Sequence, residues 1–230
     1  MIARVRPAWP ICSSLAFLLL LGLVVAGSVP VDDADVAISD ALREFGADRP
    51  GLISFVRVVT DVMSTTSFLV IGCAAAVLLL AGGSRRAAGL CAAVTVVVPV
   101  LWSLMHWLLY RPRPLDGFVT VDSNGFPSGH TANAAAAALT AVLLLWPHLR
   151  RAARAVVATT AVCFAVAVGA TRVVLLAHWP ADVLGGWLLA LAVVPPLAAW
   201  FAGPVVDRHT AAGSAGSAVG GPGAAGGREG

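Results

Sequence analysis

The sequence contains no lysine and few charged residues of any kind. Only 12% of its 230 residues are charged, whereas 59% are hydrophobic. This balance lies far outside that of soluble domains and requires a lipid environment. The net charge is +3, but no basic stripe with interleaved aromatic residues is present. We therefore expect a membrane protein, with the lipid bilayer rather than nucleic acid as its surroundings.

Other patterns are also missing. The apolar runs do not alternate with period two, which argues against a membrane β-barrel. No internal repeat is visible. The cysteines have no metal-type spacing and are expected to be small buried residues, namely Cys12, Cys73, Cys91 and Cys163.

Long apolar runs are what the sequence does contain. A transmembrane helix needs roughly 20 mostly apolar residues. Six runs qualify, at residues 11–29, 62–81, 87–110, 129–146, 155–172 and 180–201. The predicted fold is all-α, a polytopic membrane bundle of six transmembrane helices in one domain over residues 1–203. An extra interfacial helix is expected at 33–45, and a disordered Gly/Ala-rich cytoplasmic tail at 204–230.

The arginines orient this bundle. Arginines before the first run, between the second and third, and between the fourth and fifth mark cytoplasmic loops. The segment 31–50 instead holds six acidic residues against two arginines. Both termini are therefore predicted to be cytoplasmic. The first run is also compatible with a cleaved signal peptide, because Arg4 and Arg6 precede it.

Polar residues gather at the ends of the apolar runs. Four short motifs carry them: His106-x6-Arg113-Pro114, Pro127-Ser128-Gly129-His130, Thr171-Arg172 and His178-x3-Asp182. From the second motif the chain crosses the membrane and returns after about 40 residues, close to two spans and a turn. All four motifs should therefore meet at one depth on the outer side.

These residue types suit a phosphate. Ser128 is a good helix-capping residue, and the helix start after it favours an anion. Gly129 lets the backbone approach a ligand closely. Arg113 and Arg172 can each present two donors to phosphate oxygens. Three further candidates for the phosphate site are His106, Arg111 and Thr171.

Two histidines in such a site suggest divided roles. His178 is the candidate nucleophile, attacking phosphorus to give a phosphohistidine. Asp182, four residues further on, can accept the Nδ1 proton and leave Nε2 free. His130 would protonate the departing oxygen and then activate water.

The motifs resemble those of the type 2 phosphatidic acid phosphatase family, which is related in its active site to the vanadium haloperoxidases. The family pattern is Lys-x6-Arg-Pro, Pro-Ser-Gly-His and Ser-Arg-x5-His-x3-Asp. The resemblance implies the roles given above, phosphatase action without metal or cofactor, and a site facing away from the cytoplasm. Thr171 replaces the family's serine, and His106 replaces its lysine.

The expected function is that of a lipid phosphatase in a bacterial cell membrane. Its substrate would carry a terminal phosphate, as do phosphatidic acid, phosphatidylglycerol phosphate and polyprenyl diphosphates such as undecaprenyl diphosphate. A catalytically weak or silent lipid-phosphate binder is the first alternative, because His106 departs from the pattern. A zinc site is disfavoured by the crowded arginines, and a transporter by charges at span ends rather than at mid-membrane. The lipid and the oligomeric state stay open.

Overall fold

The computed structural model describes residues 2–3, 5–121 and 123–203, and these contain helices but no strand. The helices are α1 (Ala8–Val25), α2 (Val29–Ala47), α3 (Pro50–Val62), α4 (Thr65–Ala81), α5 (Arg85–Leu108), α6 (Gly129–Leu145), the short 3₁₀ helix η1 (Trp146–His148), α7 (Arg151–Val174) and α8 (Pro180–Ala202). The all-α prediction is confirmed. Arg4 and the predicted tail at 204–230 lie outside the described residues.

Six segments are long and apolar enough to cross a membrane, as predicted. They are 8–25, 50–81, 85–108, 129–148, 151–174 and 180–202. Most ends agree with the predicted runs to within a few residues. The second segment differs, because it consists of α3 and α4 with a break at Met63 and Ser64.

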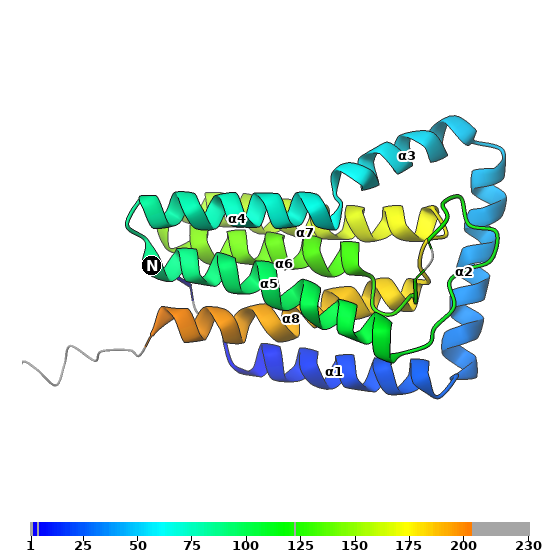
Figure 1. The fold of residues 1–230 in the computed structure, drawn as a ribbon, viewed down its shortest axis with the longest axis horizontal. Helices are drawn as coiled ribbons and strands as arrows, with labels where there is room; N and C mark the ends of the chain where they lie inside the picture. Colours follow the sequence, from blue (N-terminus) through cyan, green and yellow to red (C-terminus); the bar gives the residue numbers. More distant parts are fainter. Residues whose placement is uncertain (1, 4, 122, 204–230) are drawn as a thin grey trace, which may run out of the picture.

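The long helices run side by side along the molecule, and α2 lies across one end of them (Figure 1). Helix α6 lies at the centre, packed against α4, α5, α7 and α8. Ala132 and Ala136 on α6 are completely buried. Small side chains at such positions let neighbouring helices approach closely, which is how membrane bundles pack.

Helix α2 corresponds to the predicted interfacial helix but is longer at both ends. Helix α3, which packs on α7, was not predicted. Pro50 and Gly51 are residue types that usually interrupt a helix, yet Pro50 is the first residue of α3. Proline suits that position because its missing N–H would have no helical partner there.

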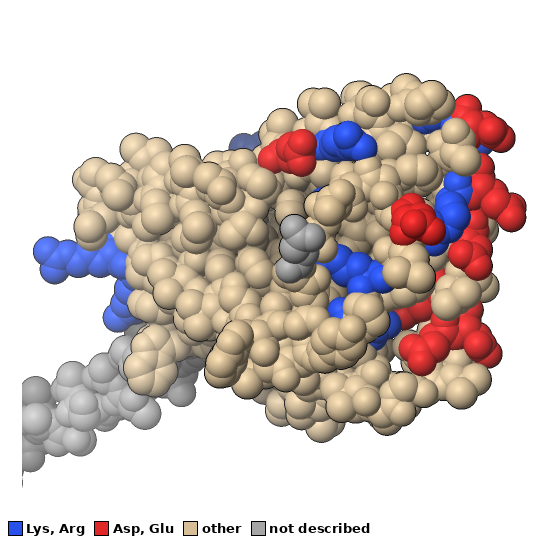
Figure 2. Space-filling view, turned by 45° about the vertical axis from the view of Figure 1, so that its right-hand side comes forward, with Lys and Arg blue, Asp and Glu red and all other residues tan. Residues whose placement is uncertain are grey.

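The two ends of the bundle differ in charge. Helix α1 begins and α8 ends at the same end, where the α4–α5 and α6–α7 connections also lie (Figure 1). The α4–α5 connection leads into Arg85 and Arg86, and the α6–α7 connection contains Arg150. Acidic side chains gather over the opposite end, along α2 (Figure 2). The exposed acidic residues of α2 and its C-terminal cap are Asp32, Asp33, Asp40, Glu44 and Asp48.

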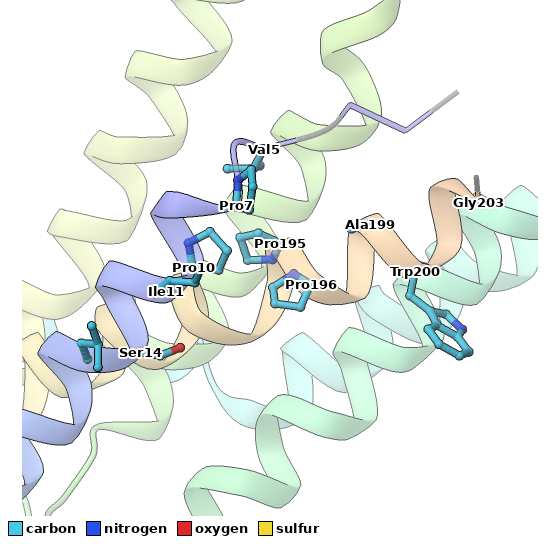
Figure 3. Close-up of a pocket in the computed structure, with 11 residues that line it drawn as sticks. Val5, Pro7, Pro10, Ile11, Ser14, Pro195, Pro196, Ala199, Trp200 and Gly203 are labelled. Atoms are coloured by element: carbon cyan, nitrogen blue, oxygen red, sulfur yellow. The ribbon is translucent and has the colours of Figure 1, made fainter. Parts of the chain in front are cut away.

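A groove of about 920 Å³ lies between the start of α1 and the end of α8 (Figure 3). Pro10 of α1 and Pro195, Pro196 and Trp200 of α8 line it. This groove is at the arginine-rich end of the bundle, away from the polar motifs.

Candidate active site

The polar motifs meet at the α2 end of the bundle. They come from the last turn of α5, the connection at residues 109–128, the start of α6, the last turn of α7, and the connection at 175–179 together with the first turn of α8. Four of their side chains are almost completely removed from solvent, namely Ser128, Arg172, His178 and Asp182. Buried polar groups of this kind need partners.

His178 lies between the carboxylate of Asp182 and the guanidinium of Arg113. Its Nδ1 is 3.4 Å from Asp182 Oδ2, and its Nε2 is 2.9 Å from Arg113 Nη1. A guanidinium can only donate, so Nε2 accepts and the ring proton lies on Nδ1, facing Asp182. Burial, followed by the charge of Arg113, lowers the pKa of His178 well below 6.5. The imidazole is therefore neutral at neutral pH.

Asp182 is held from several sides in the first turn of α8. Its Oδ2 accepts the backbone N–H of Trp179 at 3.0 Å, which closes the start of the helix. Its Oδ1 lies 3.1 Å from Arg111 Nε. A carboxylate at this end of a helix is also stabilised by the helix dipole.

Arg113 reaches from the 109–128 connection to the 175–179 connection. Its Nε donates to the Ser123 carbonyl at 2.7 Å, and its Nη2 to the Ser123 hydroxyl at 2.9 Å and the Asn124 carbonyl at 3.0 Å. Its Nη1 also contacts the Ala177 carbonyl. These contacts direct the guanidinium at His178.

Arg172 is buried in the last turn of α7. Its Nη1 donates to Thr60 Oγ1 at 3.0 Å. The hydroxyl of Thr171 donates to the Val168 carbonyl at 2.7 Å and lies 3.2 Å from the same Thr60 oxygen. Arg172 Nε is buried without a hydrogen-bond partner within the described part of the chain. This donor is available to a ligand.

His130, Ser128 and Gly129 lie at the start of α6. His130 is close enough to interact electrostatically with Arg172, His178 and Arg113, so both motif histidines belong to one cluster. Ser128 is the N-cap residue but makes no side-chain cap bond. Its hydroxyl instead accepts from Thr131 Oγ1 at 2.9 Å.

Gly129 has a packing role in this structure. A Cβ at this position would lie 2.9 Å from the indole ring of Trp102, closer than atoms can pack. This glycine was predicted to allow close approach by a ligand. The helix packing of α5 against α6 already requires it.

His106 lies beside the cluster. Its Nε2 is 2.7 Å from the Pro127 carbonyl, which can only accept, so the ring donates there. The centroids of the His106 and His178 rings are 6.5 Å apart. His106 therefore joins the end of α5 to the Pro127–His130 motif.

Arg111 lies between two carboxylates. Its Nη2 is 2.5 Å from Asp35 Oδ2 on α2, while its Nε faces Asp182. Arg111 was predicted as a further phosphate-binding candidate, whereas Asp35 was not predicted to belong to the site. Asp35 differs from the other acids of α2 because it is buried, and no spacing rule marks it in the sequence.

Thr60 is a second residue of the site that the sequence motifs do not include. It lies just before the predicted apolar run at 62–81, and only the packing of α3 on α7 brings it to Arg172. Among the described residues, no three His, Cys, Asp or Glu side chains are grouped so as to hold a metal ion.

Comparisons with known proteins agree with this arrangement. The family model of the PAP2 superfamily matches residues 88–203, just over half of the chain and all of the motifs. The chain is 42% identical over 77 residues to phosphatidylglycerophosphatase B of Escherichia coli strain K12, and equally to the proteins of that name from Escherichia coli O157:H7 and Shigella flexneri. The match covers 34% of this chain and 28% of each of these relatives. The chain thus spans less than a third of the curated relatives' length.

A solved structure matches over most of both chains. It is the crystal structure of the first transmembrane PAP2-type phosphatidylglycerolphosphate phosphatase from Bacillus subtilis. The TM-score is 0.71 at 28% identity, covering 84% of this chain and 96% of that one. The sequence match and the shared fold lead to one conclusion: this chain is a member of the PAP2 superfamily.

Proposed function

We propose that this protein is an integral-membrane lipid phosphatase that works through a phosphohistidine intermediate. The observation that carries the proposal is the row Arg113–His178–Asp182. It presents a neutral imidazole whose Nδ1 faces a carboxylate and whose Nε2 faces a cationic donor. A nucleophile oriented by a third group is the general arrangement for covalent catalysis.

In the first step, the lone pair of His178 Nε2 attacks phosphorus. The bond between phosphorus and the lipid oxygen breaks, and its electron pair leaves with that oxygen. His130, protonated when the anionic phosphate is bound beside it, gives its proton to the leaving oxygen. Asp182 stabilises the positive charge that develops on the His178 ring.

In the second step, His130 takes a proton from a water molecule. The water oxygen attacks phosphorus, and the phosphorus–nitrogen bond to His178 breaks. Inorganic phosphate leaves, His178 returns to its neutral form, and His130 is again protonated. No metal or cofactor is needed for this sequence.

The phosphoryl oxygens would be held by donors that converge on the same space. When substrate binds, Arg113 Nη1 would donate its hydrogen bond to a phosphate oxygen and no longer to His178 Nε2. The unpartnered Nε of Arg172 would donate to a second phosphate oxygen. Ser128, Gly129 and the free N–H groups at the start of α6 supply further donors. His106 lies near enough to add charge when protonated.

A lipid substrate is supported by an apolar cavity that opens at the side of the bundle. This cavity, of about 410 Å³, lies between α4, α5 and α6. Asn133, Ala137, Thr140 and Leu144 line it along one side of α6. The first of these residues, Asn133, is about one helical turn from His130. From Asn133 to Leu144 the cavity follows α6 for about 16 Å, since a helix rises about 1.5 Å per residue. An apolar chain would fit there while the phosphate occupies the cluster.

Among lipid phosphates, phosphatidylglycerol phosphate is the first candidate, because the similar proteins are phosphatases of that lipid by name. Phosphatidic acid and undecaprenyl diphosphate are the other candidates, since each joins a terminal phosphate to apolar chains. A panel of these lipids, assayed for phosphate release by the purified protein in detergent, tests the assignment.

We propose that the site faces away from the cytoplasm and that both termini are cytoplasmic. The arginines at the opposite end of the bundle support this orientation. In a background without the native cysteines, Thr120→Cys should react with a membrane-impermeant thiol reagent in intact spheroplasts. Ser84→Cys, at the arginine-rich end, should react only after permeabilisation. The reversed result would overturn the orientation.

The nucleophile is tested by His178→Ala, with His148→Ala at the other end of the bundle as its control. Substrate labelled with ³²P should leave acid-labile label on wild-type protein in a rapid quench, and none on His178→Ala. Full turnover by His178→Ala would rule out this nucleophile. Activity should persist in excess chelator, whereas a metal-dependent enzyme would stop. Binding of lipid phosphate without any hydrolysis would favour the silent-binder alternative.

A further inference from the structure

Asp35 and Arg111 form a buried ion pair that the proposed reaction does not use. Asp35 is 3% exposed and Arg111 is 9% exposed, and their closest atoms are 2.5 Å apart. Buried charges are costly unless each is paired and hydrogen-bonded. Asp35 comes from α2, which lies across the end of the bundle (Figure 1).

The second oxygen of Asp35 holds the start of α8. Its Oδ1 accepts the backbone N–H of Ala181 at 2.9 Å. Ala181 is the residue directly before Asp182. A carboxylate that accepts from the first turn of a helix satisfies a donor that the helix itself cannot. Asp35 therefore fixes the backbone from which Asp182 extends.

Arg111 completes the connection through side chains. Its guanidinium lies between Asp35 and the Oδ1 of Asp182, so it neutralises the side of that carboxylate turned away from His178. Oδ2 is left for the Trp179 N–H and for His178 Nδ1. Without Asp35, Arg111 would be free to take both oxygens of Asp182 in a bidentate pair.

We propose that Asp35 and Arg111 are positioning residues for the candidate nucleophile His178. They hold Asp182 so that one oxygen faces Nδ1 of the imidazole. This inference rests on the proposed phosphatase function. It makes α2 part of the reaction machinery and gives its one buried acid a different task from its exposed acids.

The experiment compares Asp35→Asn with Asp33→Asn in the purified full chain. Both changes remove one negative charge from α2, but Asp33 is exposed. Asp35→Asn should lower kcat for phosphatidylglycerol phosphate with little change in KM, by about 10- to 100-fold, which is the range for partners that orient the ligands of a metal site. Asp33→Asn should match the wild type. The value of kcat is calculated for the folded fraction, because loss of folded protein alone would also lower the apparent kcat at unchanged KM.

Arg111→Gln is the second variant of this experiment. It should also lower kcat, and the double variant Asp35→Asn/Arg111→Gln should be no worse than the poorer single variant, because both act through Asp182. Folding is checked by thermal unfolding and by elution in detergent. Equal kinetics for Asp35→Asn and Asp33→Asn would overturn the proposal. Failure of both Asp35→Asn and Arg111→Gln to fold would also overturn it, since the pair would then be structural. A wild-type protein that releases no phosphate would instead contradict the proposed function.

Discussion

Thr60 Oγ1 and Arg172 Nη1 lie 3.0 Å apart in a buried hydrogen bond between α3 and the last turn of α7. Thr60 is 1% exposed, and the Thr171 hydroxyl lies beside the same oxygen. The arginine proposed to bind phosphate is therefore oriented by a helix that the sequence motifs do not include.

Replacing Thr60 by Val should weaken substrate binding. The change keeps the shape but removes the acceptor for Arg172, and a hydrogen bond to a charged group contributes roughly 1.5–3 kcal/mol. We expect kcat/KM for lipid phosphate to fall about 10- to 100-fold, measured as phosphate release. Thr66→Val, at an exposed position of α4, is the control. Equal kcat/KM for the two variants would contradict a role for Thr60.

His106→Lys should keep or raise the activity. A lysine ammonium can still donate to the Pro127 carbonyl, which His106 contacts at 2.7 Å, and it carries a full positive charge near the phosphate site. His106→Ala should be less active than the wild type, because it leaves that carbonyl without its donor. Both are measured as phosphate release from one lipid. Loss of activity in His106→Lys would contradict this prediction and would show that the imidazole of His106 has a role that a lysine cannot fill.

His178 should make the stability of the protein depend on pH. Burial and the neighbouring arginines lower its pKa well below 6.5 in the folded chain, so the unfolded chain binds a proton first as the pH falls. The stability contributed by the neutral ring is thus present above pH 6.5 and is lost below it, at up to about 1.4 kcal/mol per pH unit.

The measurement is thermal unfolding in detergent between pH 8 and pH 5. His178→Asn removes the titrating group, so its unfolding temperature should fall less steeply than that of the wild type below pH 6.5. Burial raises the pKa of Asp35, which acts in the opposite direction, and the comparison between the two proteins cancels this effect. Parallel curves would contradict the neutral, buried state of His178.

Gly186→Ala should disturb the site through the backbone. A Cβ at Gly186 of α8 would lie 2.8 Å from the Ser128 carbonyl oxygen and 3.0 Å from the Ala132 nitrogen, and backbone atoms cannot move aside easily. Such overpacking costs about 1–3 kcal/mol. We expect a lower unfolding temperature and lower activity. Gly22→Ala in α1 is the control, because nothing lies within 4 Å of its added Cβ. A stable, fully active Gly186→Ala would refute this packing argument.

The bundle was predictable because lipid leaves a chain few choices. Backbone groups inside a bilayer must pair within their own segment or in a closed barrel. Apolar runs of the right length without period-two alternation therefore predict helices, and six such segments are found. The predicted run at 62–81 begins close to the break at Met63 and matches α4, whereas α3, which contains Arg57 and Asp61, was not predicted.

The number of residues between the motifs also predicted that the motif residues lie near one another. Two spans and a turn return the chain to the same end, so His130 and Arg172 lie close enough to interact electrostatically. Their roles as nucleophile, acid and phosphate ligands stay predictions. The side-chain bond expected of Ser128 as a helix cap is not formed, because its hydroxyl accepts from Thr131 instead.

The sequence by itself determined that this protein is a helical membrane bundle with the histidines and arginines of its four motifs at one end. Hydrophobic length and motif spacing act along the chain and can be counted there. Only the tertiary structure decided that Thr60 supports Arg172 and that Asp35 reaches Arg111 and the start of α8. Such contacts depend on how each helix is rotated about its axis and packed against distant helices, and no local pattern encodes that rotation.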